Sequence, residues 1–387
     1  MKRHLLLYIA LMLCMVSCRT DDYIVYMEDE ETGVKTEQTE VLGMYVLNEG
    51  NMGSNKCTLD YLDLSSQDGT IHYLRNIYAE RNPNEVKELG DVGNDAQIYG
   101  SRLWLVINCS NKVEVLRASD AVKIGKIDVP NCRSVAFHEG YAYVSSYVGP
   151  VNVSQDAPLG EVYKIDTLTL KTVAKVTVGY QPEELAVVGD KLYVANSGGY
   201  RVPDYDRTVS VIDLKTFQEE KKIDVAVNLQ RCRADRYGQL WVSSRGDYYE
   251  ESSHLCWLQR DFNGQMQRMG RLDVVVSDLC IVGDSLYFIG VKSNFQTMKN
   301  ERMLGIINVV THEVVNTRLT TAKEAAAIIQ PYGIIVNPNG RDFYLMDAKN
   351  YVSSGELLHF HADGTFDYKV RTGDIPGHAV FLTKPKK

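Results

Sequence analysis

The sequence contains 387 residues, of which 44% are hydrophobic and 24% are charged, and its formal net charge is −8. The apolar fraction is sufficient for a folded core and excludes a largely disordered chain. The negative charge, without a basic stripe carrying interleaved aromatic residues, argues against a nucleic-acid partner.

The N-terminal residues are predicted to be a targeting segment. A basic start at 2–4 precedes an apolar stretch at 5–16, which is too short to span a bilayer and is typical of a signal peptide. Ser17 and Cys18 follow, and a small residue directly before cysteine resembles the bacterial lipobox. We therefore predict a lipoprotein signal peptide at 1–17 and lipidation of Cys18. An ordinary secretion signal that ends in cysteine is the alternative.

Residues 18–40 are rich in acidic side chains and are predicted to be a tether, apart from a short β-like run at 23–27. Acidic residues just behind the lipidated cysteine also resemble the surface-export signal of Bacteroidetes lipoproteins. We expect the protein to be anchored in the outer membrane and to face the cell exterior. Lipid would be its only attachment to the membrane.

A repeated pattern begins at residue 44, where an aromatic residue within a short apolar run recurs seven times at spacings of 39 to 59 residues. Repeats of this size, built from short β-type runs, are typical of a β-propeller in which each repeat forms one four-stranded blade. We therefore predict an all-β fold, a seven-bladed β-propeller at 41–387. The seven copies lie at residues 44–46, 103–105, 142–144, 192–194, 240–242, 286–288 and 343–345.

Each repeat also contains the other parts of a blade. Tight turns that combine glycine with polar residues come before the aromatic strand, as at 189–191 and 283–285, and a polar fourth strand follows, as at 171–178. The first repeat lacks an inner strand, and we predict that residues 378–382 complete that blade and close the ring. A frayed C-terminal tail is the alternative. An alanine-rich stretch at 323–329 is predicted to form one short helical turn.

Loop lengths differ between the two faces of the predicted ring. The turns before the aromatic strands are short, whereas the connections from the aromatic to the third strand are long in every blade except the second. Insertions on one face of a repeat array usually mark its binding face. We call this side the long-loop face. Its long connections are predicted at 48–56, 145–160, 196–207, 243–253, 291–303 and 347–355, and the short one at 108–111.

Aromatic, arginine and polar side chains are concentrated on the long-loop face. Tyrosine and arginine often carry the binding energy of an interface, because they combine large contact area with few rotatable bonds. Exposed loops are also commonly polar without binding anything, which is the alternative for each residue. The predicted ligand contacts are Asn94, Asp95, Arg133, Tyr147, Tyr180, Tyr200, Arg201, Tyr205, Arg245, Tyr248, Phe295, Tyr332, Tyr351 and His378.

No arrangement of residues predicts catalysis, so we expect that the protein is not an enzyme and has no metal or cofactor of its own. His359 and His361 lie on one side of a strand, but no third metal ligand is evident nearby. An outward-facing histidine pair is therefore favoured over a metal site. Glu183 and Glu184 are interpreted as structural or solvated carboxylates.

Six cysteines follow Cys18, and their spacing matches no zinc site. Most lie in apolar strand positions and are expected to be buried as small hydrophobic side chains. An exported protein can form disulfides, and a bond between Cys109 and Cys132 stays open. The six are Cys57, Cys109, Cys132, Cys232, Cys256 and Cys280.

Four segments carry a resemblance to a known family. Residues 45–55, at the start of the first repeat, are similar to the opening motif of a family of Bacteroidetes surface-lipoprotein propellers, often described as surface-layer proteins related to the YncE-like group. Residues 108–115, 181–188 and 375–381 are similar as well. The resemblance covers 43–382 and implies a surface-exposed lipoprotein propeller.

The best-understood members of that family capture cobalamin and pass it to a TonB-dependent outer-membrane transporter. The resemblance therefore implies a small-molecule nutrient ligand, with a corrinoid such as cobalamin as the leading candidate, and a TonB-dependent transporter as the partner. Two other functions stay open. One is a surface-layer or adhesion propeller that binds a protein or glycan, and the other is a propeller hydrolase or lyase acting at the central channel.

Overall fold

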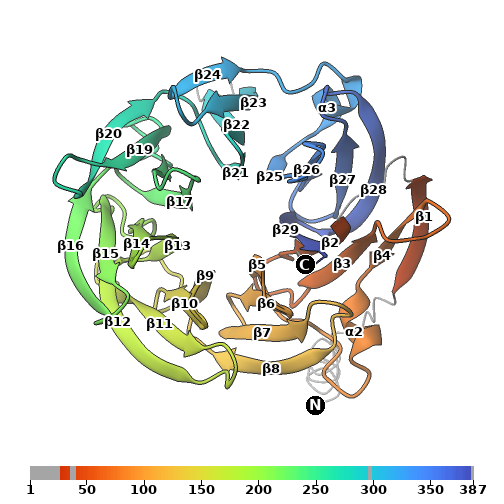
Figure 1. Cartoon of the computed structure of the whole chain (residues 1–387), viewed down its shortest axis with the longest axis horizontal. Helices are drawn as coiled ribbons and strands as arrows, with labels where there is room; N and C mark the ends of the chain where they lie inside the picture. The colour runs from red at the N-terminus through yellow and green to blue at the C-terminus, as the bar shows by residue number, and fades with distance from the viewer. Residues whose placement is uncertain (1–26, 35–40, 295–298, 385–387) are drawn as a thin grey trace, which may run out of the picture.

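Seven antiparallel β-sheets follow one another around a ring in the computed structural model, which describes residues 27–34, 41–294 and 299–384 (Figure 1). Six sheets have four strands and one has five. The predicted seven-bladed β-propeller is therefore confirmed. In blades 2 to 7 the first strand lies nearest the axis and the chain then moves outward, strand by strand.

The strand bounds agree with the predicted repeats, and the aromatic run is the second strand from the axis in every blade. Blade 1 contains β1 (Glu28–Val34), β2 (Val41–Asn48), β3 (Thr58–Asp63), β4 (Thr70–Arg75) and β29 (Pro376–Thr383). Blade 2 contains β5 (Gly93–Tyr99), β6 (Arg102–Ile107), β7 (Lys112–Arg117) and β8 (Lys123–Asp128). Blade 3 contains β9 (Cys132–His138), β10 (Tyr141–Ser146), β11 (Leu159–Asp166) and β12 (Thr172–Tyr180). Blade 4 contains β13 (Pro182–Val188), β14 (Lys191–Asn196), β15 (Thr208–Asp213) and β16 (Gln218–Asp224).

The last three blades repeat this order. Blade 5 contains β17 (Leu229–Ala234), β18 (Leu240–Ser244), β19 (His254–Arg260) and β20 (Met266–Leu272). Blade 6 contains β21 (Asp278–Val282), β22 (Ser285–Asn294), β23 (Lys299–Asn308) and β24 (Glu313–Asn316). Blade 7 contains β25 (Pro331–Val336), β26 (Phe343–Asp347), β27 (Ser354–Phe360) and β28 (Phe366–Asp374).

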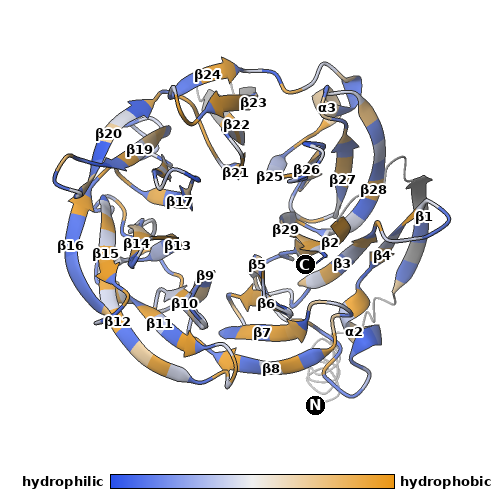
Figure 2. Ribbon diagram, viewed as in Figure 1, coloured by the Kyte–Doolittle hydropathy of each residue, from blue (hydrophilic) through white to orange (hydrophobic). Residues whose placement is uncertain are grey.

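The repeated aromatic side chains are buried between neighbouring blades. Trp104 and Trp241 are fully buried, and the hydroxyl of Tyr45 in blade 1 donates to the carbonyl of Ala118 in blade 2 at 2.9 Å. Large aromatic rings remove much apolar surface from water while their polar atoms find a partner. Outer strands are more polar, and β16 is largely blue in Figure 2 because its outward positions carry glutamate and lysine. Apolar contacts between blades therefore hold the ring together.

The C-terminal strand closes the ring as predicted. β29 is the innermost strand of blade 1 and pairs antiparallel with β2, with Tyr45 opposite Val380 and Met44 opposite Phe381. Val380 and Phe381 also contact the buried clusters on either side of the blade. The first and last parts of the chain thus form one sheet.

The acidic segment after residue 27 differs from the predicted tether. Residues 28–34 form β1, a fifth, outermost strand of blade 1 that pairs with β4. Arg75 forms ion pairs with Glu28 at 2.8 Å and Glu30 at 2.5 Å, and Arg371 reaches Glu28 at 2.8 Å. These ion pairs offset the charges of Glu28 and Glu30, and the local sequence could not show them because both arginines lie far along the chain. Cys18 and the predicted signal peptide lie outside the described residues.

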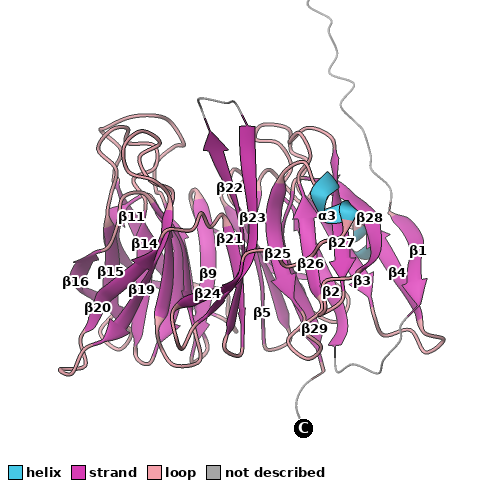
Figure 3. Cartoon of the chain, turned by 90° about the horizontal axis from the view of Figure 1, so that it is seen from above, coloured by secondary structure: helices cyan, strands magenta, loops and turns pink. Residues whose placement is uncertain are grey.

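The connection between β22 and β23 and one short helix also differ from expectation. The segment 291–303 is predicted to be a loop, but strands β22 and β23 extend through most of it, and Figure 3 shows both strands reaching the level of the surrounding loops. Phe295 lies outside the described residues. The predicted helical turn is confirmed as α3 (Lys323–Ala327), while α2 (Ile77–Arg81) was not predicted because five residues are too few to show a helical period.

The two faces of the ring differ as the loop lengths indicated (Figure 3). Glycines with positive φ, such as Gly189 (63°) and Gly283 (61°), form the tight turns that lead into the aromatic strands. The long connections project from the opposite face. No helix in the described part of the chain is long and apolar enough to cross a membrane.

Candidate functional site

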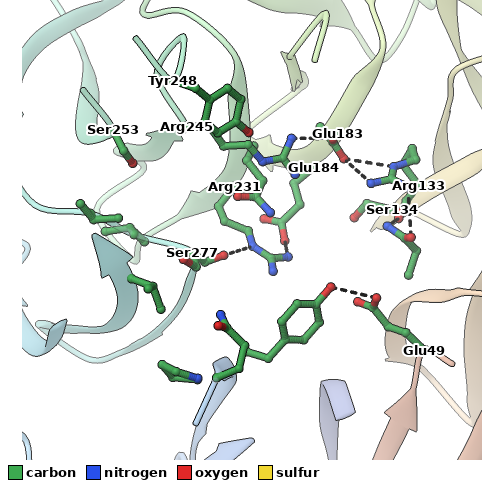
Figure 4. A pocket seen from close by; sticks show the side chains of 18 of the residues that line it. Glu49, Arg133, Ser134, Glu183, Glu184, Arg231, Arg245, Tyr248, Ser253 and Ser277 are labelled. Carbon is green, nitrogen blue, oxygen red and sulfur yellow. Dashed lines mark hydrogen bonds and ion pairs between the residues drawn. The ribbon is translucent and has the colours of Figure 1, made fainter. Parts of the chain in front are cut away.

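A cavity of about 1340 Å³ opens at the centre of the long-loop face. Its walls come from the long loops and from the first residues of the inner strands, because every inner strand begins at this face. Figure 4 shows the charged side chains that project into it. The cavity therefore lies where the sequence placed the binding face.

A repeated irregularity aims these side chains at the axis. On β13, Pro182 pairs with Asn196 and Leu185 pairs with Val194, so three steps along β13 match two along its partner. The same extra residue occurs at the start of β9 and of β17. Such β-bulges redirect side chains at the end of a strand. They present Arg133 on β9, Glu183 and Glu184 on β13 and Arg231 on β17 to the cavity.

Glu183 is shared by two arginines. Arg133 donates to its Oε2 from Nε at 3.1 Å and Nη2 at 3.0 Å, and Arg245 donates to its Oε1 from Nη1 at 3.1 Å. The hydroxyl of Tyr147 also donates to Oε1, at 2.7 Å. Burial alone would raise the pKa of Glu183, but the two arginines and Tyr147 lower the pKa to about 2. The carboxylate is therefore ionised at neutral pH.

Glu184 organises a second cluster next to the first. Arg231 donates to its Oε1 at 2.7 Å, Arg233 donates to both oxygens at 2.9 Å, and the backbone N–H of Cys232 donates to Oε2 at 3.0 Å. Arg231 also lies 3.4 Å from Asp278. Burial opposes ionisation of Glu184, but Arg233 and Arg231 lower its pKa to about 2. Carboxylates this acidic are poor proton acceptors at neutral pH, so both clusters are suited to binding and positioning.

The opposite wall is aromatic. The hydroxyl of Tyr332 donates to Glu49 Oε2 at 2.9 Å, and His378 Nε2 lies 3.3 Å from Glu49 Oε1. The ring of Tyr351 meets that of Tyr332 edge to face, with centroids 5.8 Å apart. Burial and the neighbouring carboxylate raise the pKa of Tyr332 well above its ordinary value, which keeps the phenol neutral. The cavity thus has one wall of arginine–glutamate clusters, with Tyr200 and Tyr248 beside them, and an opposite wall with Tyr332 and Tyr351.

Eight of the predicted contact residues line this cavity. They come from blade connections and long loops far apart in the sequence, which the ring brings together. The eight are Asn94, Arg133, Tyr200, Arg245, Tyr248, Tyr332, Tyr351 and His378.

The other five predicted contacts in the described chain do not line the cavity. Each lies beside or behind its wall and contacts another group of the protein. Asp95 is buried and accepts hydrogen bonds from Ser134 Oγ at 2.6 Å and the backbone of Val135 at 3.0 Å. Tyr147, 2% exposed, supports Glu183 from behind.

The remaining three lie at the loop of blade 4, which carries Arg201 and Tyr205, and at the end of β12 in blade 3, which carries Tyr180. Arg201 stacks over the ring of Tyr180, 3.7 Å from its centroid. Tyr205 packs edge to face against Tyr248, with ring centroids 6.5 Å apart. We find that these side chains shape the loop, while Tyr200 from the same loop faces the cavity.

Sequence reasoning assigned no site role to Glu183 and Glu184. They are structural, as interpreted, since each forms ion pairs with two arginines, but they also line the cavity. A signal was available: Glu183 and Arg133 both occupy the second position of an inner strand. Aligning the repeats by strand start, rather than by the aromatic residue, would have grouped them.

The cysteines and histidines do not form a metal centre in the described part of the chain, where no cluster of three or more potential ligands is found. All six described cysteines are free, including Cys109 and Cys132. Burial raises the pKa of Cys132 to about 12, so its thiol is protonated at neutral pH. His359 is 6% exposed, not outward-facing, and its Nδ1 lies 3.0 Å from Asp367.

No protein-family model and no curated protein matches the chain. The fold is shared with solved propeller structures, and each of the following is 10% identical in sequence. A hypothetical selenium-binding protein from Sulfolobus tokodaii has a TM-score of 0.62, covering 88% of this chain and 93% of that one. A protein from Bacteroides fragilis, provisionally named a 6-phosphogluconolactonase, has a TM-score of 0.59, covering 89% and 99%. The Cps50 (Swd1) β-propeller domain of Myceliophteria thermophila has a TM-score of 0.51, covering 83% and 96%. At this identity the likeness shows the fold alone.

Proposed function

We propose that this propeller captures a large polar nutrient in the central cavity of its long-loop face. The observation that carries the proposal is the cavity itself, whose volume of about 1340 Å³ exceeds the roughly 300–1,000 Å³ of ordinary small-molecule sites. Its arginine, tyrosine and histidine side chains are already held by partners within the protein, so little ordering cost remains to be overcome on binding. Such a site is suited to a bulky ligand with many peripheral polar groups.

A corrinoid such as cobalamin is the proposed ligand. Its broad ring matches a wide cavity with tyrosines on both walls, and its peripheral amides match the arginine, carboxylate and histidine groups around it. The sequence resemblance of residues 45–55 and 375–381 supports the same ligand, and these segments contribute Glu49 and His378 to the cavity. From a lipid anchor at Cys18 on the outer membrane, the protein would deliver the corrinoid to a TonB-dependent transporter.

Calorimetric titration of cobalamin into the purified protein tests the proposed ligand. Wild type should bind, and Tyr200→Ala should weaken binding by about 2 kcal/mol, because an aromatic anchor on the cavity wall is lost. Phe262→Ala is the matched control, since Phe262 is 96% exposed in a turn on the opposite face. No heat and no change in corrinoid absorbance with wild type would refute the ligand. Equal binding by the Tyr200 variant would refute its placement.

Delivery is tested separately by chemical crosslinking in native membranes. A TonB-dependent transporter should be recovered with the wild-type protein and should be lost with Cys18→Ala. Recovery of a polysaccharide or another surface protein, without any transporter, would favour a surface-layer role instead.

A further inference from the structure

The two arginine–glutamate clusters of the cavity differ in their charge balance. Around Glu184, two arginines face two carboxylates, because Asp278 also lies near Arg231. Around Glu183, two arginines share a single carboxylate. No second carboxylate of the described chain lies within ion-pair distance of Arg133 or Arg245, and their strongest electrostatic neighbours are Glu183 and nearby tyrosines. The Glu183 cluster therefore carries one excess positive charge.

This excess charge is poorly solvated. The side chains of Arg133 and Arg245 are 15% and 28% exposed, and that of Glu183 is 7% exposed. Three other acidic residues at the cavity lie next to other basic side chains, Glu251 with Arg207 at 3.5 Å, Asp273 with Arg271 at 3.3 Å and Glu49 with His378 at 3.3 Å, and Glu250 is exposed to solvent. A buried charge without a partner is unfavourable, so the site is prepared for an anion from outside the protein.

Arg245 has the donors to receive that anion. Arg133 uses Nε and Nη2 on Glu183 and Nη1 on Asn94. Arg245 uses Nη1 on Glu183, and no described residue accepts a hydrogen bond from its Nε or Nη2. These two nitrogens form the edge of a guanidinium that matches a pair of carboxylate or phosphate oxygens.

The backbone around Arg245 is fixed. Its N–H donates to the carbonyl of Asn228 at 2.9 Å, and Asn228 Nδ2 donates in return to the carbonyl of Gly246 at 3.1 Å. The side chain lines the cavity beside Tyr248, which is 56% exposed, and Tyr200, which is 37% exposed. An anion bound at Arg245 would therefore lie in a part of the cavity that also carries two partly exposed aromatic side chains.

We propose that Arg245 forms an anion subsite, in which two oxygens of a phosphate or carboxylate group on the ligand accept hydrogen bonds from its Nε and Nη2. Arg133 supplies the second positive charge of the pair, and Glu183 holds both guanidinium groups in place. The inference rests on the proposed function and makes it more specific. A corrinoid that carries the phosphodiester of a nucleotide loop is bound more tightly than one without it.

The experiment compares cobalamin, which has this phosphodiester, with cobinamide, which lacks the nucleotide loop. Both are titrated calorimetrically, at one ionic strength, into wild type, Arg245→Gln and Arg236→Gln. Arg236 is the matched control because its side chain is 57% exposed and pairs with Asp284 on the opposite face. Loss of a bidentate, charge-assisted contact should weaken cobalamin binding by about 10- to 100-fold in Arg245→Gln and should change cobinamide binding by less than about threefold.

Arg245→Lys keeps the positive charge but lacks the planar guanidinium, so its loss of cobalamin affinity should be intermediate. This variant shows whether the bidentate contact matters even if Arg245→Gln fails to fold. Equal weakening of both corrinoids by Arg245→Gln would overturn the anion subsite while leaving the corrinoid proposal intact.

Inorganic phosphate, the third probe, distinguishes the two proposals. If wild type binds neither corrinoid but binds phosphate, and Arg245→Gln abolishes that binding, the corrinoid is wrong and the subsite stands. If wild type binds neither corrinoid and phosphate binding does not depend on Arg245, both proposals fail.

Discussion

Replacing Glu183 with glutamine tests whether this carboxylate holds the arginine wall of the cavity together. The substitution keeps the size of the side chain but removes the negative charge between Arg133 and Arg245. Two guanidinium groups that are largely buried then lose their shared partner. Removing one member of a buried ion pair typically costs about 3–5 kcal/mol of folding stability.

The pKa of Glu183 gives an independent magnitude. It falls from an ordinary 4.5 to about 2 in the folded protein, and this difference corresponds to about 3 kcal/mol. Because the folded pKa is depressed, the stabilisation is fully present above about pH 4.5 and is lost as the pH falls toward 2. We therefore expect Glu183→Gln to be less stable than wild type at pH 7 by about 3 kcal/mol, and the difference to shrink below pH 4.5.

The assay is urea unfolding of wild type, Glu183→Gln and Glu313→Gln at several pH values from neutral to acidic. Glu313 is the matched control because it is exposed at the start of the outer strand β24. The control should remain within about 0.5 kcal/mol of wild type at neutral pH. If Glu183→Gln were as stable as wild type at pH 7, or if its deficit did not change with pH, the charge argument would be wrong.

Three further predictions concern the ring and the anchor. Deleting residues 376–387 removes β29 and should lower the free energy of unfolding by on the order of 5 kcal/mol, because several partly or fully buried side chains leave blade 1; an unchanged melting temperature would contradict this. Gly290→Ala should cost about 1–3 kcal/mol in urea unfolding, since a Cβ at Gly290 would clash with the backbone carbonyl oxygen of Val275, whereas the exposed Gly340→Ala, whose Cβ would come no closer than 3.3 Å to the flexible Asp342 side chain, controls for the loss of a glycine. Cys18→Ala should abolish incorporation of labelled fatty acid and release the protein from the outer membrane; full retention would show that the lipobox assignment is wrong.

Much of the fold could be predicted because a propeller repeats a local pattern. Each aromatic residue at the second strand is preceded by a tight turn and followed by a third strand, so one reliable motif locates the whole blade. The missing inner strand of the first repeat likewise indicated β29. The prediction of an acidic tether was wrong for residues 28–34, which form a strand of blade 1. Arg75 and Arg371 form ion pairs with Glu28 there, and neither arginine is close to this segment in sequence.

The sequence by itself determined the number of blades, the closing strand and the face on which the long loops gather, because periodicity and loop length are local properties. It also indicated eight residues that line the cavity, since blade connections and long loops on one face must surround the axis. Only the tertiary structure decided which of the charged residues meet. Bulges at the starts of β9, β13 and β17 turn Arg133, Glu183 and Arg231 toward the axis, and pairing across blades fixes their ionisation. A single extra residue near the end of a strand changes the phase of the two-residue alternation for only the few residues beyond it, too few to recognise in the sequence, and charge balance depends on side chains that only the closed ring brings into contact.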